Sequence, residues 1–175
     1  VYAKNDRYYV KQYQEETNLN TTIIVDASAS MRYRGREATE INANKVSKFE
    51  YAQYLASALS YMLIKQQDAV GLVTFDSKVR KFLPPKSSQD QLRKILKVLH
   101  DTNAEKETNT AEVFNEITKR IYQRGVVIII SDLFDDPDRI ANALHHFGYR
   151  KHEVILFHIM AEEELTFPFK TFSDF

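Results

Sequence analysis

Apolar residues recur along the chain at two spacings, which predicts alternating strands and helices. Short apolar runs of strand length occupy residues 21–26, 69–75 and 126–130, and Glu153–Ile159 forms a last one. The run at 126–130 consists of five consecutive β-branched residues. Such a run is typical of a central strand that is covered on both faces.

Four segments carry apolar residues at helical spacing. They are Lys48–Gln66, Leu92–Leu99, Val113–Ile121 and a segment that begins near Pro137 and ends at Gly148. Proline is favoured in the first turn of a helix and glycine just after the last turn, which sets the bounds of the fourth segment.

A turn at Asp76–Lys78 follows the second apolar run and leads into a short strand, Val79–Leu83, which Pro84 and Pro85 are expected to end. So tight a turn predicts an antiparallel edge strand. The alternation of the other elements predicts an α/β fold. We therefore expect a doubly wound, mostly parallel, Rossmann-like sheet with one antiparallel edge strand and helices on both faces.

Two acids follow two of the predicted strands and mark a candidate site. Asp26 ends the first strand, and Asp132 follows the strand at 126–130. In doubly wound sheets, ligands bind beyond the carboxyl ends of the strands, where the winding reverses. We expect these two strands to be neighbours at that point, with both carboxylates at one rim.

Hydroxyl groups accompany these acids. Alternate positions in a tight turn can direct Asp26, Ser28 and Ser30 toward one point, and Thr108 precedes a helix that is expected to begin near Asn109. All of these side chains offer oxygen, the ligand atom that hard cations such as Mg²⁺ prefer. The sequence therefore predicts a divalent cation site at this rim.

The order of these residues along the chain resembles the metal-ion-dependent adhesion site of von Willebrand factor A domains and integrin inserted domains. The residues are Asp26, Ser28, Ser30, Thr108 and Asp132. Four phrases also resemble the bacterial domain of unknown function 58 family: residues 9–17, 66–72, 130–137 and 152–155. The resemblance implies a von Willebrand factor A-like fold. It also implies that Ser28, Ser30 and Thr108 touch Mg²⁺ (or Mn²⁺) directly, with Asp26 and Asp132 acting largely through waters. Lys106 and Glu107 stand where those domains usually have glycines.

The resemblance also implies a function in protein binding, in which a partner's aspartate or glutamate completes the metal's coordination shell. A MoxR-type AAA+ ATPase is the candidate partner, because family members are often encoded beside one. Three arginines in the polar segment after the first strand, Arg32, Arg34 and Arg36, are expected to pair with acids of that partner.

Composition narrows these expectations. The 175 residues fit one domain, 1–175, expected to be a piece of a longer protein because it begins at Val1. Lys plus Arg and Asp plus Glu number 24 each, and this balance does not favour nucleic acid. The absence of cysteine fits a reducing compartment, and a cytoplasmic location is expected. No apolar run approaches the roughly 20 residues of a membrane helix, so no membrane contact is expected from this fragment.

Two other interpretations stay open. A metal-assisted hydrolase, such as a phosphatase, would favour a second acid two residues after Asp26, where Ser28 stands, and no nucleophile–base pair is evident. The chain is therefore not expected to be an enzyme. The second interpretation is a metal-free scaffold. Zinc binding by His145, His146 and His152 is disfavoured, and these residues are expected to be solvated or capping histidines. His158 is expected in the core.

Overall fold

The computed structural model describes residues 19–35, 45–105 and 110–166. They contain a five-stranded sheet of order β3-β2-β1-β4-β5, in which β3 pairs antiparallel with β2 and the other pairs are parallel. The strands are β1 (Asn20–Asp26), β2 (Ala69–Phe75), β3 (Val79–Lys86), β4 (Val126–Ser131) and β5 (Glu153–His158). The chain winds outward from β1 to β3 and then from β4 to β5. The predicted α/β fold, with its switch point between β1 and β4, is confirmed.

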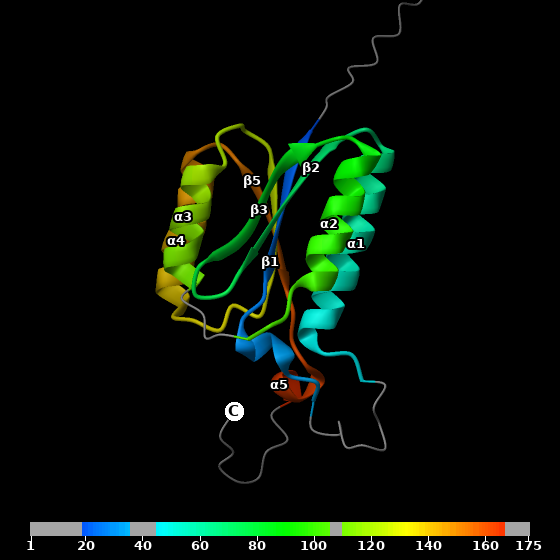
Figure 1. Ribbon diagram of the computed structural model, residues 1–175. Helices are drawn as coiled ribbons and strands as arrows, with labels where there is room; N and C mark the ends of the chain where they lie inside the picture. Colours follow the sequence, from blue (N-terminus) through cyan, green and yellow to red (C-terminus); the bar gives the residue numbers. More distant parts are fainter. Residues whose placement is uncertain (1–18, 36–44, 106–109, 167–175) are drawn as a thin grey trace, which may run out of the picture.

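Helices cover both faces of the sheet (Figure 1). The helices α1 (Lys48–Lys65) and α2 (Gln89–Asp101) lie on one face, and α3 (Thr110–Arg120) and α4 (Pro137–Tyr149) lie on the other. Two short helices, η1 (Ala29–Arg32) and α5 (Glu162–Thr166), lie beyond the carboxyl ends of the parallel strands. None of the helices in the described ranges is long and apolar enough to cross a bilayer.

Two apolar cores follow from the alternation of side chains along the strands. Ile23 and Val25 of β1 face α1 and α2, whereas Ile24 between them packs with residues of α3 and α4. The second core contains three aromatic rings in edge-to-face contact, Phe75, Phe114 and Phe147. Packing on both faces of β1 and β4 holds the ends of these strands in place. The candidate site lies at those ends.

Side-chain caps fix where two helices begin. Ser47 and Glu50 form a reciprocal capping box at the start of α1. Asp136 accepts hydrogen bonds from two backbone N–H groups at the start of α4. The end of α4 differs from the prediction, because Gly148 lies inside the helix and the left-handed residue is Lys151, with a φ of 62°.

At the two edges of the sheet, the structure differs from two further predictions. The strand β3 does not end at Pro84 but continues through both prolines to Lys86. An edge strand tolerates proline, since one side of its backbone has no strand to pair with. At the other edge, His158 is exposed and is not a core residue. The apolar pattern of β5 predicted burial, but Ile155 and Leu156 are 47% and 39% exposed.

Candidate metal-ion site at the carboxyl end of the sheet

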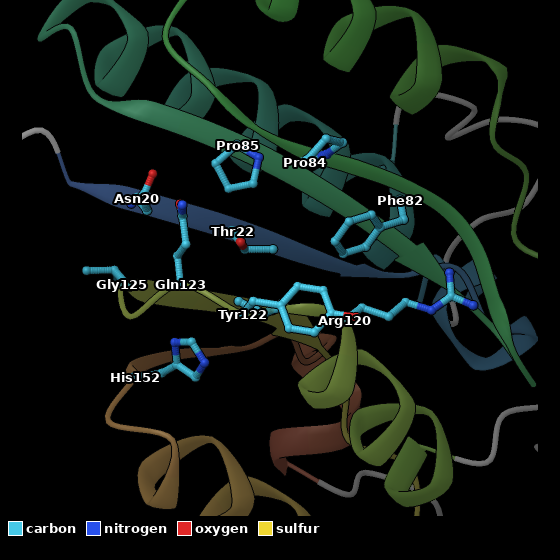
Figure 2. Close-up of a pocket in the computed structure, with 12 residues that line it drawn as sticks. Asn20, Thr22, Phe82, Pro84, Pro85, Arg120, Tyr122, Gln123, Gly125 and His152 are labelled. Carbon is cyan, nitrogen blue, oxygen red and sulfur yellow. The ribbon is translucent and has the colours of Figure 1, made fainter.

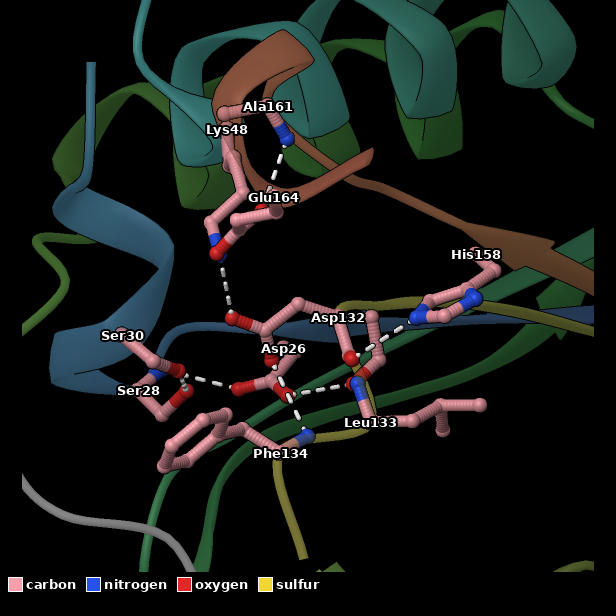
Figure 3. A network of polar contacts seen from close by, with 11 residues as sticks. Asp26, Ser28, Ser30, Lys48, Asp132, Leu133, Phe134, His158, Ala161 and Glu164 are labelled. Carbon is pink, nitrogen blue, oxygen red and sulfur yellow. Dashed lines mark hydrogen bonds and ion pairs between the residues drawn. The ribbon is translucent and has the colours of Figure 1, made fainter. Parts of the chain in front are cut away.

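Asp26 joins the ends of the two central strands. Its side chain is wholly buried at the end of β1. One carboxylate oxygen accepts a hydrogen bond from the backbone N–H of Ser28 at 2.8 Å, and the other accepts one from the Ser131 hydroxyl at 2.6 Å (Figure 3). The Ser131 oxygen accepts in turn from the N–H of Leu133 at 2.9 Å. The turns after β1 and β4 are therefore fixed against each other through one carboxylate.

The two serines of the predicted site lie together. The Oγ atoms of Ser28 and Ser30 are 3.1 Å apart, and Ser28 is almost completely buried. Ser28 keeps an extended backbone, and η1 begins at the next residue, Ala29. This local geometry brings the hydroxyls of Ser28 and Ser30 to the same side of the turn.

Asp132 lies at the same rim and contacts a buried lysine. Its Oδ2 atom is 2.9 Å from Nζ of Lys48, and its Oδ1 atom accepts a hydrogen bond from the N–H of Phe134 at 3.3 Å. The Lys48 ammonium is also 2.7 Å from Oε1 of Glu164 in α5. The Asp132 carbonyl oxygen lies 3.0 Å from Nε2 of His158. The predicted site therefore has an ammonium group beside it.

Burial controls the electrostatics of this network. Desolvation raises the pKa of Asp26 to about 6, against the lowering effect of hydrogen bonds from Ser131 and Ser28, and the nearby charge of Asp132 raises it further. Burial also tends to lower the pKa of Lys48. Its hydrogen bonds to Glu164 and Asp132 outweigh burial, and the pKa of Lys48 is raised on balance. Lys48 is therefore a cation at neutral pH.

The donor set fits a hard cation in its chemistry. It combines the hydroxyls of Ser28 and Ser30 with the carboxylates of Asp26 and Asp132, and oxygen is the ligand atom that Mg²⁺ prefers. Across the described ranges, no cluster of three or more histidine, aspartate or glutamate side chains could hold a metal ion. Any cation at this rim would therefore depend on serine hydroxyls as well as on the two acids.

Two residues of the predicted set, Thr108 and Arg36, lie outside the described residues. Of the other arginines, Arg32 is exposed, whereas Arg34 forms an ion pair with Glu50 at 3.0 Å. That pair weakens the prediction that Arg34 is available to a partner.

Sequence reasoning missed Lys48, Ser131 and Glu164. The contacts of Lys48 with Asp132 and Glu164 join residues 84 and 116 positions apart, which no local pattern reveals. One signal was present in the sequence: Lys48 directly follows the capping serine of a helix, and a cation is disfavoured at that end. A third rim acid, Asp76, lies in the predicted turn after β2, and it pairs with Arg80 at the start of β3.

A cavity of about 420 Å³ lies at the other end of the sheet (Figure 2). Asn20 and Gly125 line it beside the amino ends of β1 and β4, and a Cβ atom at Gly125 would overlap the Asn20 carbonyl oxygen. His152 also lines it and is 7% exposed. Within the described ranges, its ring nitrogens make only weak contacts, with the backbone of Gly125 and Ile121. His152 is therefore not a solvated histidine. His145 and His146 are exposed, as expected.

The chain belongs to the family described as protein of unknown function DUF58, whose sequence profile matches residues 1–173. No curated protein matches it significantly.

Among solved structures, the fold is similar to BatB from Bacteroides thetaiotaomicron, at 20% identity and a TM-score of 0.61 over 79% of this chain and 65% of that one. It is also similar to an aerotolerance-related membrane protein from Bacteroides fragilis, at 17% identity and a TM-score of 0.63 over 79% and 66%. The chain thus spans slightly less than two thirds of each.

A von Willebrand factor type A protein from Catenulispora acidiphila is also similar, at 14% identity and a TM-score of 0.50 over 78% of this chain and 31% of that one. These likenesses establish a von Willebrand factor A-like fold, the fold that the resemblance implied.

Proposed function

We propose that this domain is a metal-dependent protein-interaction module. A divalent cation, Mg²⁺ or Mn²⁺, is held by the hydroxyls of Ser28, Ser30 and Thr108, with Asp26 and Asp132 acting largely through waters. A carboxylate of a partner protein then completes the coordination shell. The observation that carries this proposal is the 3.1 Å approach of the two serine hydroxyls at the rim where Asp26 ends β1 and Asp132 follows β4.

The charge of the site supports binding rather than catalysis. If hydroxyl groups are the direct ligands, they add no formal charge, so the cation keeps its attraction for a partner's carboxylate. Asp26 already accepts hydrogen bonds on both oxygens, and Asp132 is paired with Lys48. Neither acid is placed as a free general base of the kind that metal-assisted hydrolysis needs. We therefore propose that the domain is not an enzyme.

Calorimetry tests the metal site. We expect heat on titration with Mg²⁺ or Mn²⁺, and the loss of that heat in Ser30→Ala. Ser57→Ala is a matched control, because the Ser57 hydroxyl donates to the Gln53 carbonyl within α1. The absence of heat with both metals would refute the proposal. A screen with a generic phosphate ester tests the hydrolase alternative, which metal-dependent turnover lost in Ser30→Ala would establish.

The partner is proposed from the family resemblance and is a MoxR-type AAA+ ATPase. Binding to that ATPase should require Mg²⁺, disappear with chelator and fail in Ser30→Ala. Arg32→Ala should weaken binding more than Arg34→Ala, because Arg34 is already paired with Glu50. Equal affinity with and without divalent metal would refute the metal-dependent mechanism.

A further inference from the structure

Lys48 occupies a position that two physical tendencies oppose. Its side chain is only 4% exposed, although lysine is almost never buried unless it is paired. It is also the first residue of α1, where the partial charge of the helix end is positive and disfavours a cation. The carboxylates of Asp132 and Glu164 compensate for both effects, and the ring of Tyr33 lies 5.9 Å from the ammonium.

The two carboxylates that hold Lys48 belong to different parts of the molecule. Asp132 is part of the candidate metal site at the end of β4. Glu164 belongs to α5, and its second oxygen accepts a hydrogen bond from the N–H of Ala161 at 2.7 Å, which fixes it within its own turn. Lys48 lies between them, as Figure 3 shows. Its ammonium therefore connects the candidate site to α5.

An ammonium group and a divalent cation make opposing demands on Asp132. Both are stabilised by its negative charge, and they repel each other at short range. A protonated lysine has three donors and no acceptor, so it cannot serve as a metal ligand. A cation that draws on the charge of Asp132 must weaken the 2.9 Å contact between Asp132 and the Lys48 ammonium. The ammonium can still keep its 2.7 Å contact with Glu164.

We propose that Lys48 is a resident counter-ion of Asp132 that a divalent cation has to displace, and that Glu164 is the positioning residue that retains the displaced ammonium. This inference rests on the proposed metal site and goes beyond it. It assigns to Lys48 and Glu164 opposite effects on metal affinity, although both belong to one ion-pair network.

Two variants test these opposite effects by calorimetry with Mn²⁺. Lys48→Met removes the competing cation and should tighten Mn²⁺ binding by about tenfold. Glu164→Gln leaves the ammonium with Asp132 alone and should weaken binding by roughly threefold. Lys45→Met is the matched control: Lys45 also pairs with an α5 acid, Glu163 at 3.5 Å, and should leave the affinity unchanged.

A merely structural role would give a different pattern. If the network only held α5 in place, Lys48→Met and Glu164→Gln would both loosen the rim and shift the affinity in the same direction. Glu164→Gln also keeps the Lys48–Asp132 pair, so it remains informative if Lys48→Met does not fold. A shift in the same direction in both variants, or no shift in Glu164→Gln, would overturn the inference.

Direct observation of the ammonium gives a second readout. In lysine-selective nitrogen NMR, the resonance that is absent from Lys48→Met identifies the Lys48 ammonium. It should move on addition of Mg²⁺ and remain visible, because Glu164 retains it. An unmoved resonance, with calorimetric heat present, would overturn this inference and leave the metal site intact. No heat in the wild type or in either variant would instead remove the proposed function and this inference together.

Discussion

The two ends of the parallel sheet bury polar groups in opposite ways. At the carboxyl end, Asp26, Asp132 and Lys48 each contact partners that lie far away in the sequence. At the amino end, His152 is as deeply buried as Asp132, yet among the described residues its ring nitrogens make only weak contacts, with the backbone of Ile121 and Gly125. Burial alone therefore does not mark the candidate site. The convergence of several paired groups distinguishes it.

The same comparison separates the two ends by their response to pH. Burial disfavours the charged form of both groups, so it raises the pKa of Asp26 and lowers that of His152. Aspartate gains a charge on losing a proton, whereas histidine loses one. The two ends should therefore contribute to stability with opposite dependence on pH, and single substitutions can isolate each contribution.

The largest expected effect is on metal binding at the carboxyl end. Ser28→Ala should weaken Mn²⁺ binding by at least about 100-fold, since losses of supporting residues alone cost 10–100-fold. It should cost about 1–2 kcal/mol of folding stability, because the Ser28 hydroxyl contacts Ser30 and also forms a hydrogen bond with the Asp26 carboxylate. Calorimetry and urea unfolding measure the two quantities. His152→Leu, at the other end, is the control that should retain metal affinity.

The second effect is on stability at the same end. The pKa of Asp26 in the folded protein, about 6, lies above the ordinary value of 3.8. The folded state thus binds more protons between these values, and the free energy of unfolding contributed by Asp26 falls as pH rises through this window. Asp26→Asn should remove that fall and stabilise the metal-free protein at pH 8 by about 1–3 kcal/mol.

Urea unfolding of both proteins at pH 4 and pH 8 measures this prediction. The two should differ little at pH 4, where Asp26 is protonated. A destabilised Asp26→Asn protein at pH 8 would show that the charged carboxylate is favoured in the folded state, contrary to the effect of its burial.

Much of this architecture could be predicted from local pattern. The apolar run at 126–130 and the winding of the chain placed β4 beside β1, and so placed Asp132 at the rim with Asp26. The alternation of Asp26, Ser28 and Ser30 reflects the turn itself. These features could be predicted because strand periodicity and turn geometry depend on only a few neighbouring residues.

The failures came from tertiary context. The pattern of β5 suggested a buried strand with His158 in the core, but β5 lies at the sheet edge and His158 is exposed. His152, just before that strand, is the buried histidine. Lys48 could not be recognised as a site residue because its partners come from the turn after β4 and from α5, which only the folded chain brings to the start of α1.

At the amino end, a smaller effect of opposite sign is expected. The pKa of His152 is lowered by burial, so the unfolded state binds more protons just below the ordinary value of 6.5. The contribution of His152 to stability is then present above pH 6.5 and is lost as pH falls below it. His152→Leu should remove this loss. It should be neutral or stabilising by up to about 1 kcal/mol at pH 7, because it removes buried ring nitrogens that make only weak contacts with the backbone.

Unfolding of His152→Leu from pH 7 down to pH 5 measures that change, with exposed His145→Leu as the control. A loss of more than about 2 kcal/mol at pH 7 would show that the His152 nitrogens make hydrogen bonds worth retaining, since a broken buried bond costs about that much.

The smallest expected effect is the coupling between the two ends. Asp26 and Asn20 stand at opposite ends of β1, which at about 3.3 Å per residue separates the rim from the cavity by roughly 20 Å. Sites so far apart with no shared partner are additive to within about 0.5 kcal/mol. The double variant Asp26→Asn, His152→Leu should therefore change stability by the sum of the single changes at every pH. A larger deviation would show that β1 and β4 transmit strain between the ends. A partner bound at the cavity could then alter metal binding at the rim, and the contrast drawn between the two ends would fail.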